Sequence, residues 1–336
     1  MEDKNPPKQF VSIYYDQNIL DFFIKGFFDQ ENFITIPDCL VIPVFSDITI
    51  VEILRIENEE SREKFLEYLD KRDFYHISID YENDAAKLIR LRAKEMYEQI
   101  INESGQFAPL EEAFLDLTHS FIGGEDALSP AENMGKIIDC SFNMLKEVLE
   151  DVSEDVVFPD EISNQIDALK MNKNQMKEAF YDIFPSSGET DEALKRIKEE
   201  FDIDPQKLNN ISPEDAVINI WKLIQPKLTG SFHQHKKIED FLQSIYQGNE
   251  KTPWTSMHLI SSLYNALNYF GYWQDRRLVK KNKFIPSYND SRHAYHASYS
   301  DVFVTRDKRF AKKLKAVYVY LGINTRVIHI GTLKET

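Results

Sequence analysis

The side chains of this sequence that suggest chemistry are carboxylates at the ends of short apolar runs. Asp16 directly follows the β-branched and aromatic run at residues 10–15, and Asp307 comes just after a similar run at residues 301–305, which Asp301 opens. Both runs have the residue types of β-strands. Ligands of an open parallel sheet bind beyond the carboxyl ends of its strands, so this pattern places Asp16 and Asp307 at a ligand site.

Two further carboxylates belong to helices that we predict beside these strands. Glu52 lies on a predicted helix that follows the extended run 41–45, and Asp290 stands at the N-terminus of a predicted short helix over 291–298. Carboxylates that converge on one spot repel one another and raise some of their pKa values. A hard divalent cation with oxygen ligands removes that penalty. Mg²⁺ or Mn²⁺ held in this way generates a hydroxide nucleophile and stabilises charge on a phosphodiester.

A structural role competes with this interpretation. Asp290 and Asp307 are both placed to cap the N-terminus of the following helix, and Asp16 stands at a strand-to-helix junction. Taken singly, such an aspartate is more often a cap than a ligand. The joint arrangement of these carboxylates and the pattern around them favour the ligand hypothesis.

Both ends of the chain have the pattern of an α/β fold, whereas the pattern from Glu82 to about Gly271 is almost entirely helical, with an apolar stripe over 83–102. The remaining segments predicted at the two ends are helices over 18–28, 59–69 and 308–321 and strands over 74–79 and 325–330. We therefore predict an α/β fold in which a parallel sheet is flanked by helices and interrupted by a large all-helical insertion. The expected domains are a discontinuous sheet domain (8–81 and 272–336) and the insertion (82–271).

The distribution of charge limits the class of partner. The chain has 336 residues and a formal net charge of −16, which argues against a non-specific coat on DNA. The segment 275–315 nevertheless carries twelve Lys or Arg and four Asp, so a local basic zone of +8 stands against −24 for the rest. This zone is typical either of a polyanion site or of a solvated helix face. Four basic residues lie beside the candidate carboxylates in the sequence: Arg292, Arg306, Lys308 and Arg309. They either contact the phosphates of a nucleic acid or form ordinary helix surface.

Composition and known motifs exclude several other classes. Two cysteines, Cys39 and Cys140, rule out a disulfide scaffold and indicate a reducing compartment. No apolar run is long enough to cross a membrane, and the first residues lack a signal-peptide pattern, so we expect a cytoplasmic protein without a membrane partner. Motifs of nucleotide hydrolysis, dinucleotide redox chemistry and serine hydrolysis are absent from the sequence.

The two ends of the chain resemble the PIN-like nuclease superfamily. The opening IYYDQNILDFF is similar to the family's strand-Asp-x-Asn-hydrophobic start, with Asp16 and Asn18 matching, and PVFSDITIVEIL resembles the stretch that carries the family's second acidic residue, here Glu52. The segment NDSRHAYHASYSDVFVTRDKRFAKKL resembles the family's most specific block, and NTRVIHI resembles its last strand. The matching positions in that block are Asp290, Ala294, Ala297, Asp301, Thr305, Asp307 and Phe310.

This resemblance implies a compact parallel-sheet fold in which both chain ends build one acidic, metal-dependent site. By motif position, its metal ligands and catalytic groups would be Asp16, Glu52, Asp290 and Asp307, with Asp301 as a fifth candidate ligand. Asn18 and Thr305 would be supporting polar groups. Asp47, Glu57 and Glu59 compete with Glu52 because they are close to it in sequence. The resemblance covers about a third of the chain and leaves the long helical block without a counterpart.

Two functions follow as expectations. The first is a metal-dependent endonuclease that uses Mg²⁺ or Mn²⁺ and cuts RNA in preference to DNA, acting as a regulated toxin or defence effector. The second is a catalytically inactive PIN-like scaffold whose acidic helical insertion binds a protein partner.

Overall fold

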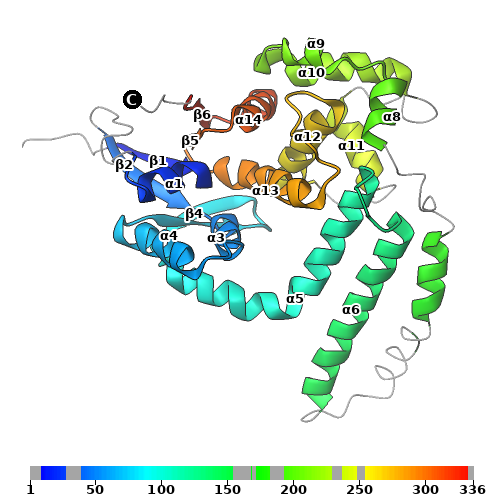
Figure 1. Ribbon diagram of the computed structural model, residues 1–336, viewed down its shortest axis with the longest axis horizontal. Coiled ribbons are helices and arrows are strands. Elements are labelled where there is room, and N and C mark those ends of the chain that lie inside the picture. Colours follow the sequence, from blue (N-terminus) through cyan, green and yellow to red (C-terminus); the bar gives the residue numbers. More distant parts are fainter. Residues whose placement is uncertain are drawn as a thin grey trace, which may run out of the picture. The chain divides into compact units, whose positions relative to one another are not determined.

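The computed structural model describes residues 9–27, 39–153, 168, 172–181, 193–228, 237–247 and 254–331 (Figure 1). The chain forms two compact units. The first contains residues 1–100, 200–275 and 287–336, and the second contains residues 101–199 and 276–286. Residues 200–271 therefore belong with the two chain ends, whereas the sequence pattern assigned them to the insertion.

A six-stranded sheet lies in the first unit, with the strand order β4-β3-β2-β1-β5-β6. All neighbouring strands pair in parallel except β3 and β4, which are antiparallel. The predicted α/β class is thus confirmed, as a mostly parallel mixed sheet flanked by helices. The strands are β1 (Gln9–Tyr15), β2 (Cys39–Phe45), β3 (Tyr75–Asp80), β4 (Ala85–Ile89), β5 (Val302–Thr305) and β6 (Arg326–His329).

The described helices flank this sheet or form the second unit. In chain order they are α1 (Gln17–Ile24), α3 (Asp47–Leu54), α4 (Glu59–Lys71), α5 (Ala93–Phe121), α6 (Pro130–Ser153), α8 (Ala193–Glu200), α9 (Pro205–Asn209), α10 (Pro213–Ile224), the 3₁₀ turn η1 (Gln225–Lys227), α11 (Ile238–Gln247), α12 (Ser256–Phe270), α13 (Lys281–Ala297) and α14 (Lys308–Leu321).

The two ends of the chain meet at the centre of the sheet, where β1 pairs in parallel with β5. Tyr14 is in register with Phe303, and the backbone N–H of Asp16 donates to the carbonyl of Val304 at 3.0 Å. Parallel neighbours end at the same edge of a sheet. The carboxyl ends of β1 and β5 therefore lie side by side although 289 residues separate Asp16 from Thr305.

Alternation along these strands gives the sheet two apolar faces. On one face, Ile13 and Tyr15 of β1 and Val304 of β5 pack with buried residues of α1, α3 and α4. On the other face, the aromatic rings of Tyr14 and Phe303 lie 5.8 Å apart, and Phe303 continues to Phe310 of α14 at 5.1 Å. Figure 1 shows α3 and α4 on one side of the sheet and α14 on the other. Helices therefore cover both sides of the sheet at the carboxyl-terminal halves of β1 and β2, whereas Phe10 and Leu40 near the starts of these strands are exposed.

Two predicted elements are wrong in the structure. Residues 85–89, expected at the start of a helix over 83–102, form the edge strand β4, because pairing with β3 outweighs the local helical pattern. The short helix expected over 291–298 is instead the longer α13, which begins at Lys281. Asp290 therefore lies inside a helix, and the predicted role of this residue as an N-cap is excluded.

The second unit is built mainly from α5 and α6. Ala113, Leu117 and Ile137 form its small apolar cluster. Asp116 of α5 lies 2.7 Å from the Lys281 ammonium and 3.2 Å from that of Lys136. Among the described residues, no helix is both long enough and apolar enough to cross a membrane.

Asp301 ties the first residues of β5 to β1. Its Oδ2 accepts hydrogen bonds from the backbone N–H and the hydroxyl of Ser12, both at 2.7 Å, and its own N–H donates to the Ser12 hydroxyl at 2.9 Å. Hydrogen bonds to an ionised acceptor are stronger than neutral ones. This contact holds the amino-terminal edge of the β1–β5 pair.

We expect the variant Asp301→Ala to lose about 1–3 kcal/mol of unfolding free energy, because two charge-assisted hydrogen bonds disappear at once. Urea denaturation checks this value. The control is Asp21→Ala, which removes only the exposed pair with Lys25 on α1 and should cost about 0.5 kcal/mol or less. Equal losses in the two variants would contradict the structural role of Asp301.

Candidate active site

The carboxyl edge of β1 and β5 carries the first two candidate carboxylates. Asp16 directly follows β1, and Asp307 stands two residues after β5 at the start of α14. Parallel pairing of the two strands brings both residues to the same edge. The structure thereby unites groups from the two chain ends, as the sequence pattern predicted.

Asp16 is buried, with 7% of its surface exposed. It occupies the N-cap position of α1, but its side chain makes no capping bond. Instead its Oδ2 accepts hydrogen bonds from the Thr305 hydroxyl and from the Asn18 amide, each at 2.5 Å. Asn18 is itself held by the backbone N–H of Arg306, which donates to its Oδ1 at 3.0 Å. Asn18 and Thr305 therefore orient the Asp16 carboxylate.

The electrostatic environment of Asp16 disfavours its negative charge. Burial raises its pKa to about 6, and the carboxylates of Glu52 and Asp307 act in the same direction, against His293 and the Thr305 hydrogen bond. The ordinary value is 3.8. Negative charge is therefore concentrated at this edge and is only partly compensated by the protein.

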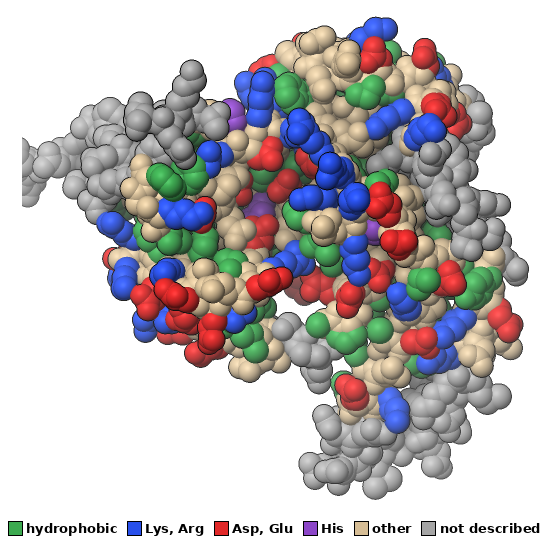
Figure 2. Space-filling model, in the orientation of Figure 1, with side chains coloured by type: hydrophobic (Ala, Val, Ile, Leu, Met, Phe, Trp, Pro, Cys, Tyr) green, Lys and Arg blue, Asp and Glu red, His purple; other side chains and the backbone are tan. Residues whose placement is uncertain are grey.

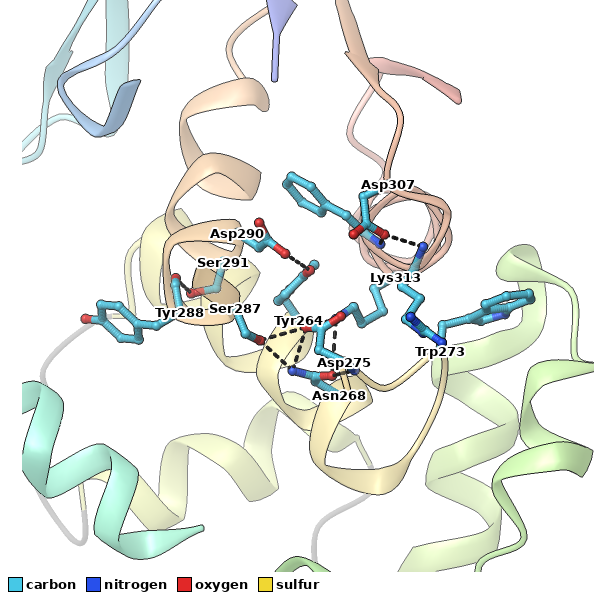
Figure 3. Close-up of polar contacts among 12 residues, drawn as sticks. Tyr264, Asn268, Trp273, Asp275, Ser287, Tyr288, Asp290, Ser291, Asp307 and Lys313 are labelled. Atoms are coloured by element: carbon cyan, nitrogen blue, oxygen red, sulfur yellow. Dashed lines mark hydrogen bonds and ion pairs between the residues drawn. The ribbon is translucent and has the colours of Figure 1, made fainter. Parts of the chain in front are cut away.

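Asp290 faces the same region from the interior of α13. The hydroxyl of Tyr264 on α12 donates to its Oδ2 at 3.4 Å (Figure 3). Burial, and then the negative charges of Asp275 and Asp16, raise the pKa of Asp290 well above its ordinary value, although Lys313 opposes them. Asp16 is thus close enough to Asp290 for its negative charge to raise the pKa of Asp290.

Glu52 comes from α3 and is paired with a histidine. Its Oε2 lies 3.0 Å from Nε2 of His293, and its Oε1 accepts from the Asn289 amide at 3.5 Å. Burial alone would raise the pKa of Glu52, but His293 and Asn289 hold that pKa below its usual value. Burial alone would likewise lower the pKa of His293, and the Glu52 carboxylate raises it instead. Both shifts favour an ionised pair.

The other two sequence candidates have different positions. Asp307 caps α14: its Oδ1 accepts from the backbone N–H groups of Arg309 at 2.6 Å and Phe310 at 2.9 Å, so the structural alternative holds for this residue. Asp301 lies at the opposite end of β5, where it binds Ser12. The short strand β5 separates Asp301 from the acidic edge, and it does not join the other four carboxylates.

A buried polar network beside Asp290 was not predicted. Lys313 of α14, counted with the basic zone in the sequence, is fully buried. Its ammonium lies 2.6 Å from Asp275 and 3.1 Å from the Asn268 carbonyl oxygen, and Ser287 donates to Asp275 at 2.7 Å (Figure 3). Only the position of Lys313 on the apolar face of α14, shared with Phe310, Leu314 and Val317, pointed to its burial.

Two of the four basic residues named as nucleic-acid contacts lie on aromatic rings beside Asp307. The Arg306 guanidinium lies 3.5 Å from the centre of the Phe22 ring, and the Lys308 ammonium lies 4.9 Å from the Trp273 ring. Lys308 is exposed, whereas Arg306, Arg309 and Arg292 are partly buried. Figure 2 shows Lys and Arg side chains beside a recessed area in which acidic and histidine side chains are visible.

The donor chemistry of this edge fits a hard divalent cation. Its carboxylate oxygens come from separate elements, and burial together with neighbouring negative charge raises the pKa values of Asp16 and Asp290. A cation would relieve this penalty. Within the described residues, however, no three His, Cys, Asp or Glu side chains are arranged to hold a metal ion.

No protein-family model, no curated protein and no solved structure matches this chain. Its function is accordingly inferred from the geometry and electrostatics of the carboxyl edge.

Proposed function

We propose that this protein is a metal-dependent nuclease of the PIN-like kind that hydrolyses phosphodiester bonds, with RNA as the favoured substrate. Asp16, Glu52, Asp290 and Asp307 would hold the metal. The observation that carries the proposal is the parallel pairing of β1 with β5, which brings Asp16 to the edge at which Asp307 stands. The raised pKa values of Asp16 and Asp290 support it.

Each group at this edge has a definite task in the proposed reaction. Mg²⁺ or Mn²⁺, when bound, would supply a hydroxide nucleophile and stabilise charge on the phosphate. Asn18 and Thr305 keep the Asp16 carboxylate in one orientation through two short hydrogen bonds. Arg306 and Lys308, on either side of Asp307, would contact the phosphates of the nucleic acid. A large helical part would suit a cytoplasmic toxin or defence effector whose activity is regulated.

A second candidate is an inactive scaffold of the same fold that binds a protein partner through its acidic helical residues. The observation that favours it is the pairing of Glu52 with His293, which already satisfies one of the four carboxylates without a metal. Under this alternative the remaining carboxylates lower the free energy of unfolding and bind no cation.

The nuclease proposal predicts that Asp16→Asn and Asp290→Asn each reduce Mn²⁺-dependent cleavage of single-stranded RNA by at least about 100-fold, because each removes a charged ligand. Cleavage of labelled RNA in a gel assay measures the rate. Asp21→Asn on the exposed face of α1 is the matched control and should cleave like the wild type. Equal cleavage by all four proteins would overturn the proposed site.

A thermal-shift experiment separates the two candidates. A cation that binds only the folded chain stabilises it by about 2.7 kcal/mol at 100 times its Kd. Under the nuclease proposal, millimolar Mn²⁺ raises the Tm of the wild type but leaves that of Asp290→Asn unchanged. Absence of any shift in the wild type supports the scaffold.

The pKa of Asp16 predicts a pH-dependent stability in EDTA, without metal. A carboxyl group whose pKa is raised from 3.8 to about 6 binds more protons in the folded chain, so stability falls as the pH rises from about 4 to 6. Asp16→Asn lacks this loss. Its unfolding free energy should exceed that of the wild type by on the order of 1–3 kcal/mol at pH 7, and the gain should vanish near pH 4.

Urea denaturation across this pH range measures the effect. The control is Asp21→Asn, which changes only the exposed pair with Lys25 and should differ from the wild type by about 0.5 kcal/mol or less. A constant offset between Asp16→Asn and the wild type would show that Asp16 does not titrate as proposed.

A further inference from the structure

A buried polar chain runs behind the Glu52 carboxylate. The hydroxyl oxygen of Tyr14 lies 2.6 Å from Nδ1 of His293, 2.7 Å from the Ser46 hydroxyl and 3.1 Å from the Thr49 hydroxyl. The other ring nitrogen of His293, Nε2, lies 3.0 Å from Oε2 of Glu52. Four elements contribute to this chain, namely β1, the β2–α3 junction, α3 and α13.

The members behind Glu52 are almost completely shielded from water. Tyr14 and Ser46 have no exposed surface, and Thr49 and His293 are each 2% exposed. Buried polar groups are costly unless they are paired. Packing alone does not require the Tyr14 hydroxyl, because a phenylalanine would fill the same space in the core. The three partners of this hydroxyl therefore indicate a role beyond packing.

The buried polar chain is consistent with either protonation state of His293. A neutral ring that is protonated at Nε2 accepts a hydrogen bond from the Tyr14 hydroxyl at Nδ1. A charged ring donates from both nitrogens, and Tyr14 then donates to Ser46 or Thr49. In both cases Tyr14 fixes the orientation of the imidazole, and the edge-on packing of the two rings, 5.7 Å apart, restricts it further.

Glu52 benefits from this rigidity. A glutamate has three rotatable side-chain bonds, and ordering such a side chain carries an entropic cost. His293 on one oxygen and Asn289 on the other select one of its conformations. Partners that hold a metal-binding carboxylate in this way change metal affinity or activity by about 10–100-fold when they are mutated.

We propose that Tyr14 and His293 are positioning residues that hold the Glu52 carboxylate toward the acidic edge for metal binding. The metal part of this inference rests on the proposed nuclease function. Tyr14 and His293 touch neither substrate nor metal, and act only through Glu52.

The test variant is Tyr14→Phe, which keeps the ring in the core and removes the hydroxyl. The control is Tyr318→Phe, which removes another buried hydroxyl. This hydroxyl donates to the backbone carbonyl of Ala294 at 2.5 Å and, among the described hydrogen bonds, has none to Glu52 or to the His293 ring. Both variants should lower the Tm. Only Tyr14→Phe should weaken Mn²⁺ binding, by about 10-fold or more, as measured by calorimetric titration. Equal Mn²⁺ affinity in the two variants would overturn the positioning role.

A double-mutant cycle shows whether Tyr14 acts through Glu52. If it does, adding Tyr14→Phe to Glu52→Gln leaves the Mn²⁺ affinity of the single Glu52 variant unchanged, because the group to be positioned is already altered. Independent effects would instead multiply. A further 10-fold loss in the double variant contradicts the proposal even when each single variant behaves as expected.

The two hypotheses fail in different ways. If the wild type binds no Mn²⁺, the proposed metal site is wrong, and positioning is then measured in the metal-free chain by ¹H–¹⁵N NMR of the His293 ring. Tyr14→Phe and Glu52→Gln should both shift its nitrogen resonances, whereas Tyr318→Phe should not. Unchanged nitrogen resonances of His293 in Tyr14→Phe and Glu52→Gln would refute the buried polar chain itself.

Discussion

The parallel contact between β1 and β5 is the constraint on which the rest of the first unit depends. It joins segments almost 290 residues apart, so its loop-closure cost must be met by burial. Ile13, Tyr14, Phe303 and Val304 are all essentially inaccessible to water. Asp301 with Ser12 holds one edge of this strand pair, and the Asp16–Val304 backbone bond holds the other. The positions of Asp16 and Asp307 at the acidic edge depend on these few residues.

The same contact brings carboxylates close together, and the protein neutralises only some of their negative charge. It assembles carboxylates that the linear sequence keeps apart, and it does so where water is scarce. Glu52 has its counter-charge in His293, and Asp275 has one in Lys313, which is completely buried. Asp16 and Asp290 have hydrogen-bond donors but no cation of their own at contact distance among the described ion pairs. Unequal compensation is what distinguishes these two carboxylates from ordinary buried acids.

The strands and the order of the elements could be predicted at the chain ends, because strand periodicity and the helix over 308–321 are local signals. Edge strand β4 could not, since Ala85–Ile89 becomes a strand only through pairing with β3. The candidate carboxylates were found as single residues at element ends, yet their roles depend on tertiary contacts. Asp301 accepts a hydrogen bond from Ser12. Asp290 lies inside a helix, and the sequence has no clear capping signal where that helix begins, at Lys281. The burial of Lys313 and of His293 could not be predicted either, because the residues that contact these side chains are distant from them in sequence.

The position of β5 between β1 and β6 also has a consequence during protein synthesis. Strand β1 is translated long before its neighbour on one side, which does not exist until residues 302–305 have been translated. A nascent chain therefore carries Asp16 and Glu52 without Asp290 and Asp307. Whatever chemistry the completed edge performs, translation through Asp307 must precede it, and a product that terminates before Asp290 carries only two of the four carboxylates.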